Sequence, residues 1–412
     1  MRKLQTLIAL TLLSSIAFGQ GPRIKVGIEV LRERGFDILR GKRIGLITNP
    51  TAVDANLVST IDILHKAPGV KLVALFGPEH GVRGDFAAGE DVESYTDPAT
   101  GIPVYSLYGS VRKPTGEMLE GIDLLVYDIQ DIGIRSYTYI STMGLAMEAA
   151  AERGIPFVVL DRPNPLGGLR IEGNVAEREF FSFIGQYPVP YVYGLSCGEL
   201  ARLLTGEGML TKSVRCKLTV IPMKGWKRMM TFEETGRVWV PTSPHIPHAS
   251  TVQYCVATGV AGEIDGGFAG IGYTLPFEVF ATEGINPYRF AAAMDSLHLE
   301  GVLFRPITLR PFYGNHKDST LSGVQLHITD CAKVNILSLQ FHLLEVLSRL
   351  YPDKNPFATQ SRRRFAGFDK AAGTDWIRKE FSKRMRYADI EGYLNKDVKA
   401  FRKLSEKYYL YK

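Results

Sequence analysis

Residues 123–154 read DLLVYDIQDIGIRSYTYISTMGLAMEAAAERG, and this stretch decides the fold class. Its first part, Asp123–Ile129, is an almost continuously apolar run of strand length, as expected for a strand buried on both faces of a sheet. Its last part, Tyr137–Arg153, repeats apolar residues at helical spacing and ends at Gly154, which favours a helix C-terminus. The stretch therefore predicts a strand, a polar loop and a helix in succession.

The same alternation of apolar runs and helical patterns extends from about residue 42 to residue 223. A strand–helix–strand rhythm indicates βαβ units, and hence a parallel, doubly wound α/β sheet. In such a sheet the loops that leave the carboxyl ends of the strands form the ligand crevice. The other predicted strands are Arg43–Thr48, Lys71–Phe76, Val104–Leu107, Pro156–Leu160 and Cys216–Pro222.

A second, smaller α+β domain is predicted after Pro287 from a helix (Arg289–Leu297), a strand (Gly323–Thr329) and a long helix (Val334–Tyr351). A chain of 412 residues is also long enough for two domains. We place the boundary near residue 285, so that the domains cover residues 21–285 and 286–412.

The first twenty residues are interpreted as a signal peptide. Arg2 and Lys3 precede an apolar run, Leu7–Leu13, and Ala17-Phe18-Gly19 supplies small residues for cleavage. The apolar run is too short to span a bilayer, and no later stretch approaches the required length. We therefore expect a periplasmic or secreted protein without a membrane span.

The overall charge and composition are those of an ordinary globular protein. The net charge is +6, and 45% of the residues are hydrophobic, which excludes disordered, collagen-like and coiled-coil classes. Residues 354–412 hold 16 basic and seven acidic residues, so the positive charge belongs to the C-terminal end. The last part, Asp389–Lys412, is predicted to form one basic helix, either docked by its aromatic side or exposed to an anionic polymer.

Two short motifs suggest chemistry that their context argues against. Gly194–Gly198 matches the nucleophile elbow of α/β-hydrolases, with Ser196 as nucleophile. The prolines just before it do not suit a buried strand, and Ser196 with Glu199 fits a capping box that opens a helix. His245 and His248 are separated by Pro247, so no helix presents them together to a metal. No glycine-rich nucleotide motif follows any strand, and no cofactor, metal or nucleic-acid partner is expected.

Four polar loops follow predicted strands and carry the functional prediction. One is GPEHGVRGD at residues 77–85, in which glycines separate ionisable residues of different kinds. The others are Tyr127–Tyr137, Leu160–Pro165 and Thr48–Thr51. If they converge, the crevice holds several carboxylates, and a carboxylate pair is what glycosidic bond hydrolysis requires. The alternative is a buried ion-pair network made by Arg83, Asp128, Asp131, Arg135, Asp161 and Arg162.

The same loops resemble the exo-β-N-acetylmuramidase (NamZ) family. The resemblance runs from about Val26 to Lys412 and includes GLITNPT (45–51), GPEHGVRGD, DIQDIG (128–133) and RPNPLGG (162–168). It implies a Rossmann-like domain joined to a smaller C-terminal domain. It also implies release of terminal N-acetylmuramic acid from the non-reducing ends of peptidoglycan fragments.

The resemblance and the positions of the loops together suggest roles for individual residues. Glu79 is the expected general acid, carried over from the family's GPEH motif, and Asp128 or Asp131 is the second carboxylate. An arginine is suited to the lactyl carboxylate of muramic acid, because it forms bidentate pairs with carboxylates. The candidate substrate-binding residues are Asn49, His80, Arg83, Asp85, Arg135, Tyr137, Arg162 and Asn164.

One segment departs from the family pattern. Phe268–Phe277 lacks a glutamate and two arginines that the family tends to have there, and His245 stands where an asparagine is usual. The rival to the hydrolase hypothesis is therefore a non-catalytic or altered-specificity paralogue that binds muropeptides or other amino sugars. Sugar binding without sugar release would distinguish this rival.

Overall fold

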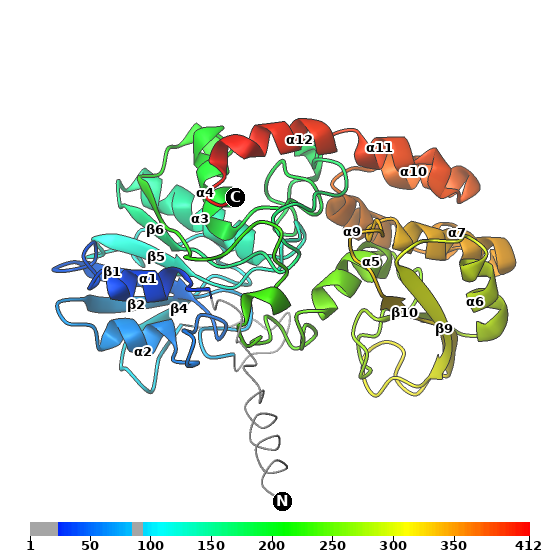
Figure 1. Ribbon diagram of the computed structural model, residues 1–412, viewed down its shortest axis with the longest axis horizontal. Coiled ribbons are helices and arrows are strands. Elements are labelled where there is room, and N and C mark those ends of the chain that lie inside the picture. The colour runs from blue at the N-terminus through cyan, green and yellow to red at the C-terminus, as the bar shows by residue number, and fades with distance from the viewer. Residues whose placement is uncertain (1–23, 85–93) are drawn as a thin grey trace, which may run out of the picture.

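The computed structural model describes residues 24–84 and 94–412, and its first unit is built on one large sheet (Figure 1). Within these residues seven strands form this sheet in the order β3-β4-β2-β1-β5-β6-β7. All neighbours pair in parallel except β3, which is antiparallel to β4. The strands are β1 (Arg43–Thr48), β2 (Lys71–Gly77), β3 (Tyr95–Thr96), β4 (Pro103–Ser106), β5 (Leu124–Asp128), β6 (Phe157–Leu160) and β7 (Leu218–Ile221). The predicted parallel sheet is confirmed, whereas the predicted signal peptide and Asp85 lie outside the described residues.

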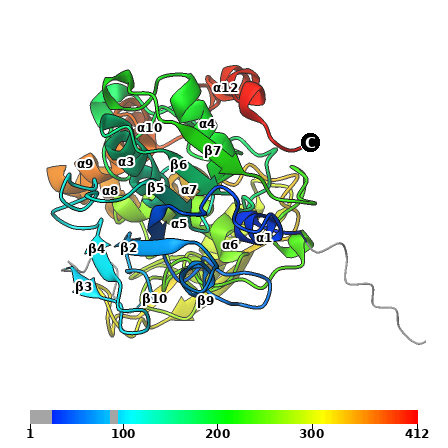
Figure 2. The ribbon, with the colours of Figure 1, turned by 90° about the vertical axis from the view of Figure 1, so that its left-hand side faces the viewer.

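Helices cover both faces of this sheet, as expected of a doubly wound fold. On one face α1 (Gly27–Glu33) and α2 (Thr60–His65) bury their apolar residues against alternate residues of the strands. On the other face α3 (Tyr139–Glu152) and α4 (Cys197–Gly206) do the same (Figure 2). At Gly27 the packing of α1 on the sheet is close, because an added Cβ would lie 2.5 Å from the backbone nitrogen of Asp161.

The order of the strands reverses at β1. The chain passes from β1 to β2 and β4 on one side, and then from β5 to β6 and β7 on the other side. Thr48 at the end of β1 is in register with Asp128 at the end of β5. The switch point therefore lies between these two carboxyl ends, which is where doubly wound sheets bind ligands.

The second unit packs helices against a smaller sheet, as the predicted α+β domain requires. This three-stranded antiparallel sheet has the order β8-β10-β9. Its strands are β8 (Val279–Thr282), β9 (Val302–Leu309) and β10 (Leu321–Ile328), and its helices are α5 (Thr251–Glu263), α6 (Pro287–Asp295), α7 (Leu339–Leu350), α8 (Pro356–Thr359), α9 (Arg362–Ala372) and α10 (Trp376–Arg384). The boundary at residue 285 stays a prediction; β8, which precedes it, pairs with β10, which follows it.

The prediction of one helix over Asp389–Lys412 was wrong. The segment contains α11 (Glu391–Asn395) and α12 (Val398–Ser405), and it ends in an extended tail. Tertiary contacts override helix propensity here. The Asp397 carboxylate accepts from the backbone N–H of Val175 at 3.0 Å, and the tail returns to the first unit (Figure 1).

Short 3-10 turns join several of these elements. They are η1 (Arg178–Phe180), η2 (Thr211–Ser213), η3 (Glu233–Thr235), η4 (Pro352–Lys354), η5 (Tyr387–Asp389) and η6 (Glu406–Tyr408). Among the residues that the structure describes, no helix has the length and apolar character needed to cross a membrane.

Candidate functional site

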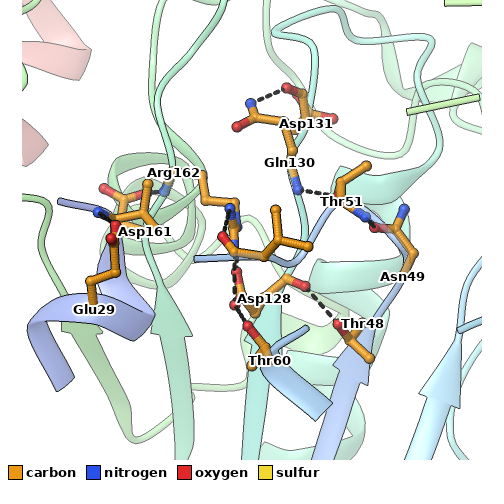
Figure 3. Close-up of polar contacts among 12 residues, drawn as sticks. Glu29, Thr48, Asn49, Thr51, Thr60, Asp128, Gln130, Asp131, Asp161 and Arg162 are labelled. Carbon is orange, nitrogen blue, oxygen red and sulfur yellow. Dashed lines mark hydrogen bonds and ion pairs between the residues drawn. The ribbon is translucent and has the colours of Figure 1, made fainter. Parts of the chain in front are cut away.

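The loops after β1, β5 and β6 meet at the carboxyl edge of the sheet (Figure 3). The Thr48 hydroxyl donates to the Asp128 carbonyl at 3.1 Å, and the Gln130 N–H donates to the Thr51 hydroxyl at 2.9 Å. The Gln130 amide also donates to the carbonyl of Pro163 at 2.7 Å. Three of the four predicted loops are therefore held together by direct hydrogen bonds.

Asp128 lies at the centre of this edge in a buried ion pair with Arg162. The two side chains are 0% and 3% exposed, and two nitrogens of the guanidinium donate to the two carboxylate oxygens, one of them at 3.1 Å. The Thr60 hydroxyl donates to Asp128 Oδ2 at 2.6 Å (Figure 3). Both carboxylate oxygens are thus occupied. This placement supports the buried ion-pair interpretation for Asp128 and Arg162 and gives no support to direct substrate contact.

Asp131 is also buried, but its surroundings are different. Its Oδ2 accepts from the backbone N–H of Gly133 at 2.7 Å and from the hydroxyl of Tyr193. Its Oδ1 has no hydrogen-bond partner in the described part of the chain. Burial raises the pKa of Asp131 to about 6, against the opposing effects of Tyr193 and of backbone N–H groups. Asp131 can therefore hold a proton at mildly acidic pH.

Glu79 follows β2 and has a different environment from both aspartates. Its side chain is partly exposed, and Thr138 at the start of α3 donates its hydroxyl to Oε2 at 3.2 Å. No lysine, arginine or histidine of the described residues forms an ion pair with it. Burial, and next the negative charge of Glu79, raise the pKa of Tyr139, so the two side chains are close. Of the three predicted catalytic residues, Asp128 and Asp131 are buried, and Asp128 is also held in an ion pair. Glu79 is the one that is partly exposed.

The residues next to Glu79 in its loop are fixed in place. His80 is 8% exposed and has a φ of 74°, a left-handed conformation that non-glycine residues seldom adopt. Arg83 donates to Asp97 at 3.0 and 3.1 Å and to Asp62 at 3.2 Å, which raises the pKa of its guanidinium. Arg83 therefore anchors the loop, and its predicted contact with a lactyl group finds no support in this pairing.

Arg135 is fully buried and binds backbone carbonyls. It donates to the carbonyls of Asn174 at 2.7 Å, Val189 at 2.8 Å and Ala371 at 3.0 Å. Burial lowers its pKa to about 10. The guanidinium joins three distant segments and has no exposed surface, so its predicted contact with substrate also finds no support.

Asn49 and Asn164 are buried in the turns that they stabilise. The Asn49 carbonyl oxygen accepts from the N–H of Thr51 at 3.0 Å. Asn164 accepts from the N–H of Leu166 at 2.9 Å and donates to the carbonyl of Leu195 at 3.0 Å. Both side chains are only 3% exposed. Each amide therefore shapes a loop of the site from within.

Tyr137 lies between the edge of the large sheet and the second unit. Its hydroxyl donates to the Thr242 hydroxyl at 2.8 Å, and its ring packs edge-on against Tyr139. It lines a cavity of 190 Å³ to which both units contribute; the other lining residues include Ser136, Ser243, His245, Glu263 and Phe277. This cavity lies beside the helix start that binds Glu79.

Several residues of this site were not predicted from the sequence. Thr138 and Thr242 bind predicted residues, but a single threonine in a loop carries no signal of its own. His245 was considered as a metal ligand and as a departure from the family pattern; its Nε2 lies 2.9 Å from the hydroxyl of Tyr313. No group of three potential metal ligands occurs within residues 24–84 and 94–412.

Ser196 caps a helix, as predicted. Its hydroxyl accepts from the N–H of Glu199 at 3.2 Å, and the Glu199 carboxylate accepts from the N–H of Ser196 at 3.1 Å. The Ser196 hydroxyl donates to Asp161 at 2.7 Å and is buried. The cap interpretation is confirmed, and within the described residues the Ser196 hydroxyl donates to an aspartate and not to a histidine.

Comparison with known proteins gives the family. The profile described as "Exo-beta-N-acetylmuramidase NamZ, N-terminal" matches residues 44–250, and the corresponding C-terminal profile matches residues 266–411. The chain belongs to the exo-β-N-acetylmuramidase NamZ family. The resemblance stated from the sequence motifs is thereby confirmed.

Individual proteins match this chain along almost their whole length. The peptidoglycan β-N-acetylmuramidase NamZ of Bacillus subtilis (strain 168) is 44% identical over 392 residues, which are 95% of this chain and 92% of that protein. A crystal structure of a DUF1343 family protein from Bacteroides fragilis NCTC 9343 is 55% identical, with a TM-score of 0.91 over 95% of this chain and 99% of the other. A second such protein from the same organism is 28% identical, with a TM-score of 0.76 over 94% and 99%. The two-unit fold is therefore that of the family.

Proposed function

We propose that this protein is a glycosidase that releases terminal N-acetylmuramic acid from the non-reducing ends of peptidoglycan fragments. Membership of the NamZ family supports the reaction and the substrate class. The single structural observation that carries the proposal is the position of Glu79. It is a partly exposed carboxylate without an ion-pair partner among the described residues, at the ligand-binding edge of the sheet.

Glu79 is suited to the role of general acid. A general acid must keep its proton until the glycosidic oxygen accepts it, and a neighbouring arginine would favour the ionised form. The three arginines of the predicted site are bound to other partners: Arg83 to Asp97 and Asp62, Arg162 to Asp128, and Arg135 to backbone carbonyls. None of these guanidinium groups is therefore paired with Glu79, and its partly exposed carboxyl group remains accessible to a substrate.

Asp131 remains the proposed second carboxylate. Its pKa of about 6 and its unpartnered Oδ1 suit a group that exchanges a proton, whereas Asp128 is held by Arg162. Because Asp131 is 4% exposed, its role would be to act on the reacting groups through the loop that it shapes or through a water molecule. No cofactor is needed for acid–base hydrolysis of this kind.

The test is the substitution Glu79→Gln, assayed by release of N-acetylmuramic acid from muramic-acid-terminated saccharides. It preserves size and hydrogen bonding but removes the transferable proton, so turnover should fall by about 10²–10⁴-fold or more. Glu117→Gln is the matched control, because Glu117 is an exposed glutamate in the loop before β5. Unchanged thermal unfolding of both variants shows that the fold is intact. Near-normal turnover of Glu79→Gln would reject the assignment.

We also propose that the protein acts in the periplasm or outside the cell. The support is the sequence pattern of residues 1–20, which has the charge, apolar run and small residues of a cleaved signal. Fractionation of cells that express the full chain, followed by mass spectrometry, should find the protein outside the cytoplasm and shortened by about twenty residues. An uncleaved cytoplasmic protein would reject this proposal.

A further inference from the structure

Two exposed aromatic rings lie on the loop between β9 and β10, and a third, partly exposed ring from the segment before β8 packs against one of them. Phe312 and Tyr313 are 59% and 51% exposed, and the ring of Tyr273 packs against Phe312 at a centroid distance of 5.4 Å. We refer to Tyr273, Phe312 and Tyr313 as the aromatic ledge. Large rings that stay in contact with water on a folded protein commonly mark a binding surface.

The aromatic ledge is fixed by polar and backbone contacts. The N–H of Phe312 donates to the carbonyl of Gly272 at 2.7 Å. Gly272 has a φ of 106°, and a Cβ there would lie 2.3 Å from the carbonyl oxygen of Tyr313, so only glycine permits this approach. The hydroxyl of Tyr313 lies 2.9 Å from Nε2 of His245, and the two rings are nearly parallel, at 23°. The rings are therefore oriented before any ligand arrives.

A chain of contacts connects the ledge with Glu79. Thr138 binds Glu79, and the adjacent Tyr137 lines the inter-unit cavity together with His245, which binds Tyr313. Burial, and next the charge of nearby His80, lower the pKa of His245, which places His245 close to the Glu79 loop. The aromatic ledge thus belongs to the second unit and is connected with Glu79 through Thr138, Tyr137 and His245.

We propose that the aromatic ledge binds the pyranose ring that follows the terminal sugar, with Tyr313 as its principal contact. This inference rests on the proposed function, in which Glu79 acts at the terminal glycosidic bond. A pyranose ring presents weakly positive C–H groups, and the face of an aromatic ring is negative, so the two surfaces attract each other. A contact with this second ring favours the binding of a saccharide over that of a single sugar.

The test measures dissociation constants by calorimetry in the Glu79→Gln background, in which the bond is not cleaved. The ligands are the disaccharide N-acetylmuramic acid–N-acetylglucosamine and the methyl glycoside of N-acetylmuramic acid. Tyr313→Ala should weaken disaccharide binding about three- to tenfold and leave the methyl glycoside unaffected. Tyr313→Phe keeps the ring and should bind the disaccharide within about twofold of the parent. Tyr288→Ala is the matched control, because Tyr288 is a 73% exposed tyrosine on α6.

Each outcome bears on one proposal. The proposed role of the aromatic ledge is overturned if Tyr313→Ala leaves the disaccharide affinity unchanged or weakens the binding of both ligands equally. It is also overturned if the Glu79→Gln parent does not bind the disaccharide. Failure of the wild-type protein to release sugar, combined with ledge-dependent disaccharide binding, rejects the proposed hydrolysis and keeps the ledge. Because Tyr313 is half exposed, its substitution leaves the folded core intact.

Discussion

Two carboxylates at the same sheet edge, Asp128 and Glu79, differ in what surrounds them. Asp128 has a buried arginine and a threonine on its oxygens, whereas Glu79 has one threonine and access to solvent. A paired, buried carboxylate mainly fixes structure, because removing either partner leaves an uncompensated charge. The two residues should therefore respond differently to substitution.

Asp128→Ala is expected to lower the free energy of unfolding by about 3–5 kcal/mol, because Arg162 then stays buried without a counter-charge. Urea denaturation measures this loss. The matched control is Asp37→Ala, which removes the exposed partner of Arg34 and should leave the unfolding midpoint unchanged. A similar small effect for both substitutions would show that the buried pair is not structural.

Asp131 should make stability depend on pH in the mildly acidic range. Its pKa is raised from 3.8 to about 6 in the folded protein. Between these values the folded state binds more protons than the unfolded state, so Asp131 lowers the unfolding free energy as pH rises from about 4 to 6. Asp131→Asn removes this titration. The stability of the variant relative to the wild type should rise over the same range, as measured by urea denaturation at several pH values; a constant difference would contradict the raised pKa.

The sequence predicted where polar residues gather but not which partners they bind. Loop positions after strands follow from local patterns, and the loops of β1, β5 and β6 do meet. Partners depend on residues far along the chain: Arg135 binds the carbonyl of Ala371, 236 positions away. No local pattern indicates that the partner of an arginine is a backbone carbonyl or a substrate. This is why three arginines appeared equivalent in the sequence and have separate roles in the structure.

At the scale of elements, local signals were sufficient where the structure depends on local contacts. The capping box at Ser196 satisfies backbone N–H groups within one turn of α4, so four residues determine it. The apolar runs predicted β1 and β2 almost to the residue, because a strand buried on both faces needs them. The local pattern did not predict the C-terminal segment correctly, because the conformation of this segment depends on contacts with the first unit.

Ser196→Ala tests the structural interpretation of the elbow-like motif. Loss of the cap and of the bond to Asp161 should lower stability by about 0.5–2 kcal/mol, seen as a lower thermal unfolding midpoint. Ser196→Thr keeps a hydroxyl cap and should restore most of this loss. Sugar release by folded Ser196→Ala should persist, and a serine-directed phosphonate should not inactivate the wild type. Inactivation by the phosphonate would instead support Ser196 as the nucleophile of an α/β-hydrolase elbow.

At the scale of the whole molecule, the last four residues bind the C-terminal tail to the first unit through hydrogen bonds and a cation–π contact. The N–H of Leu410 donates to Glu199 at 2.8 Å, and the carbonyl of Lys412 accepts from the N–H of Arg228 at 3.0 Å. The guanidinium of Arg228 lies 3.4 Å from the ring centre of Tyr409. Since the chain before this tail passes over from the second unit (Figure 1), the tail fixes the path of α12 across the molecule.

Tyr411 provides the most direct test of this tail. Its hydroxyl donates to the buried Asp161 and accepts from the N–H of Met223 at 2.9 Å, next to the end of β7. Tyr411→Phe removes both bonds and leaves two buried polar groups short of a partner, which should cost about 1–3 kcal/mol. Tyr288→Phe, at an exposed site, should cost nothing measurable. Urea denaturation compares the two, and limited proteolysis should cut the tail of Tyr411→Phe sooner. Equal stability and equal proteolysis of the two variants would show that the tail lies on the first unit without stabilising it.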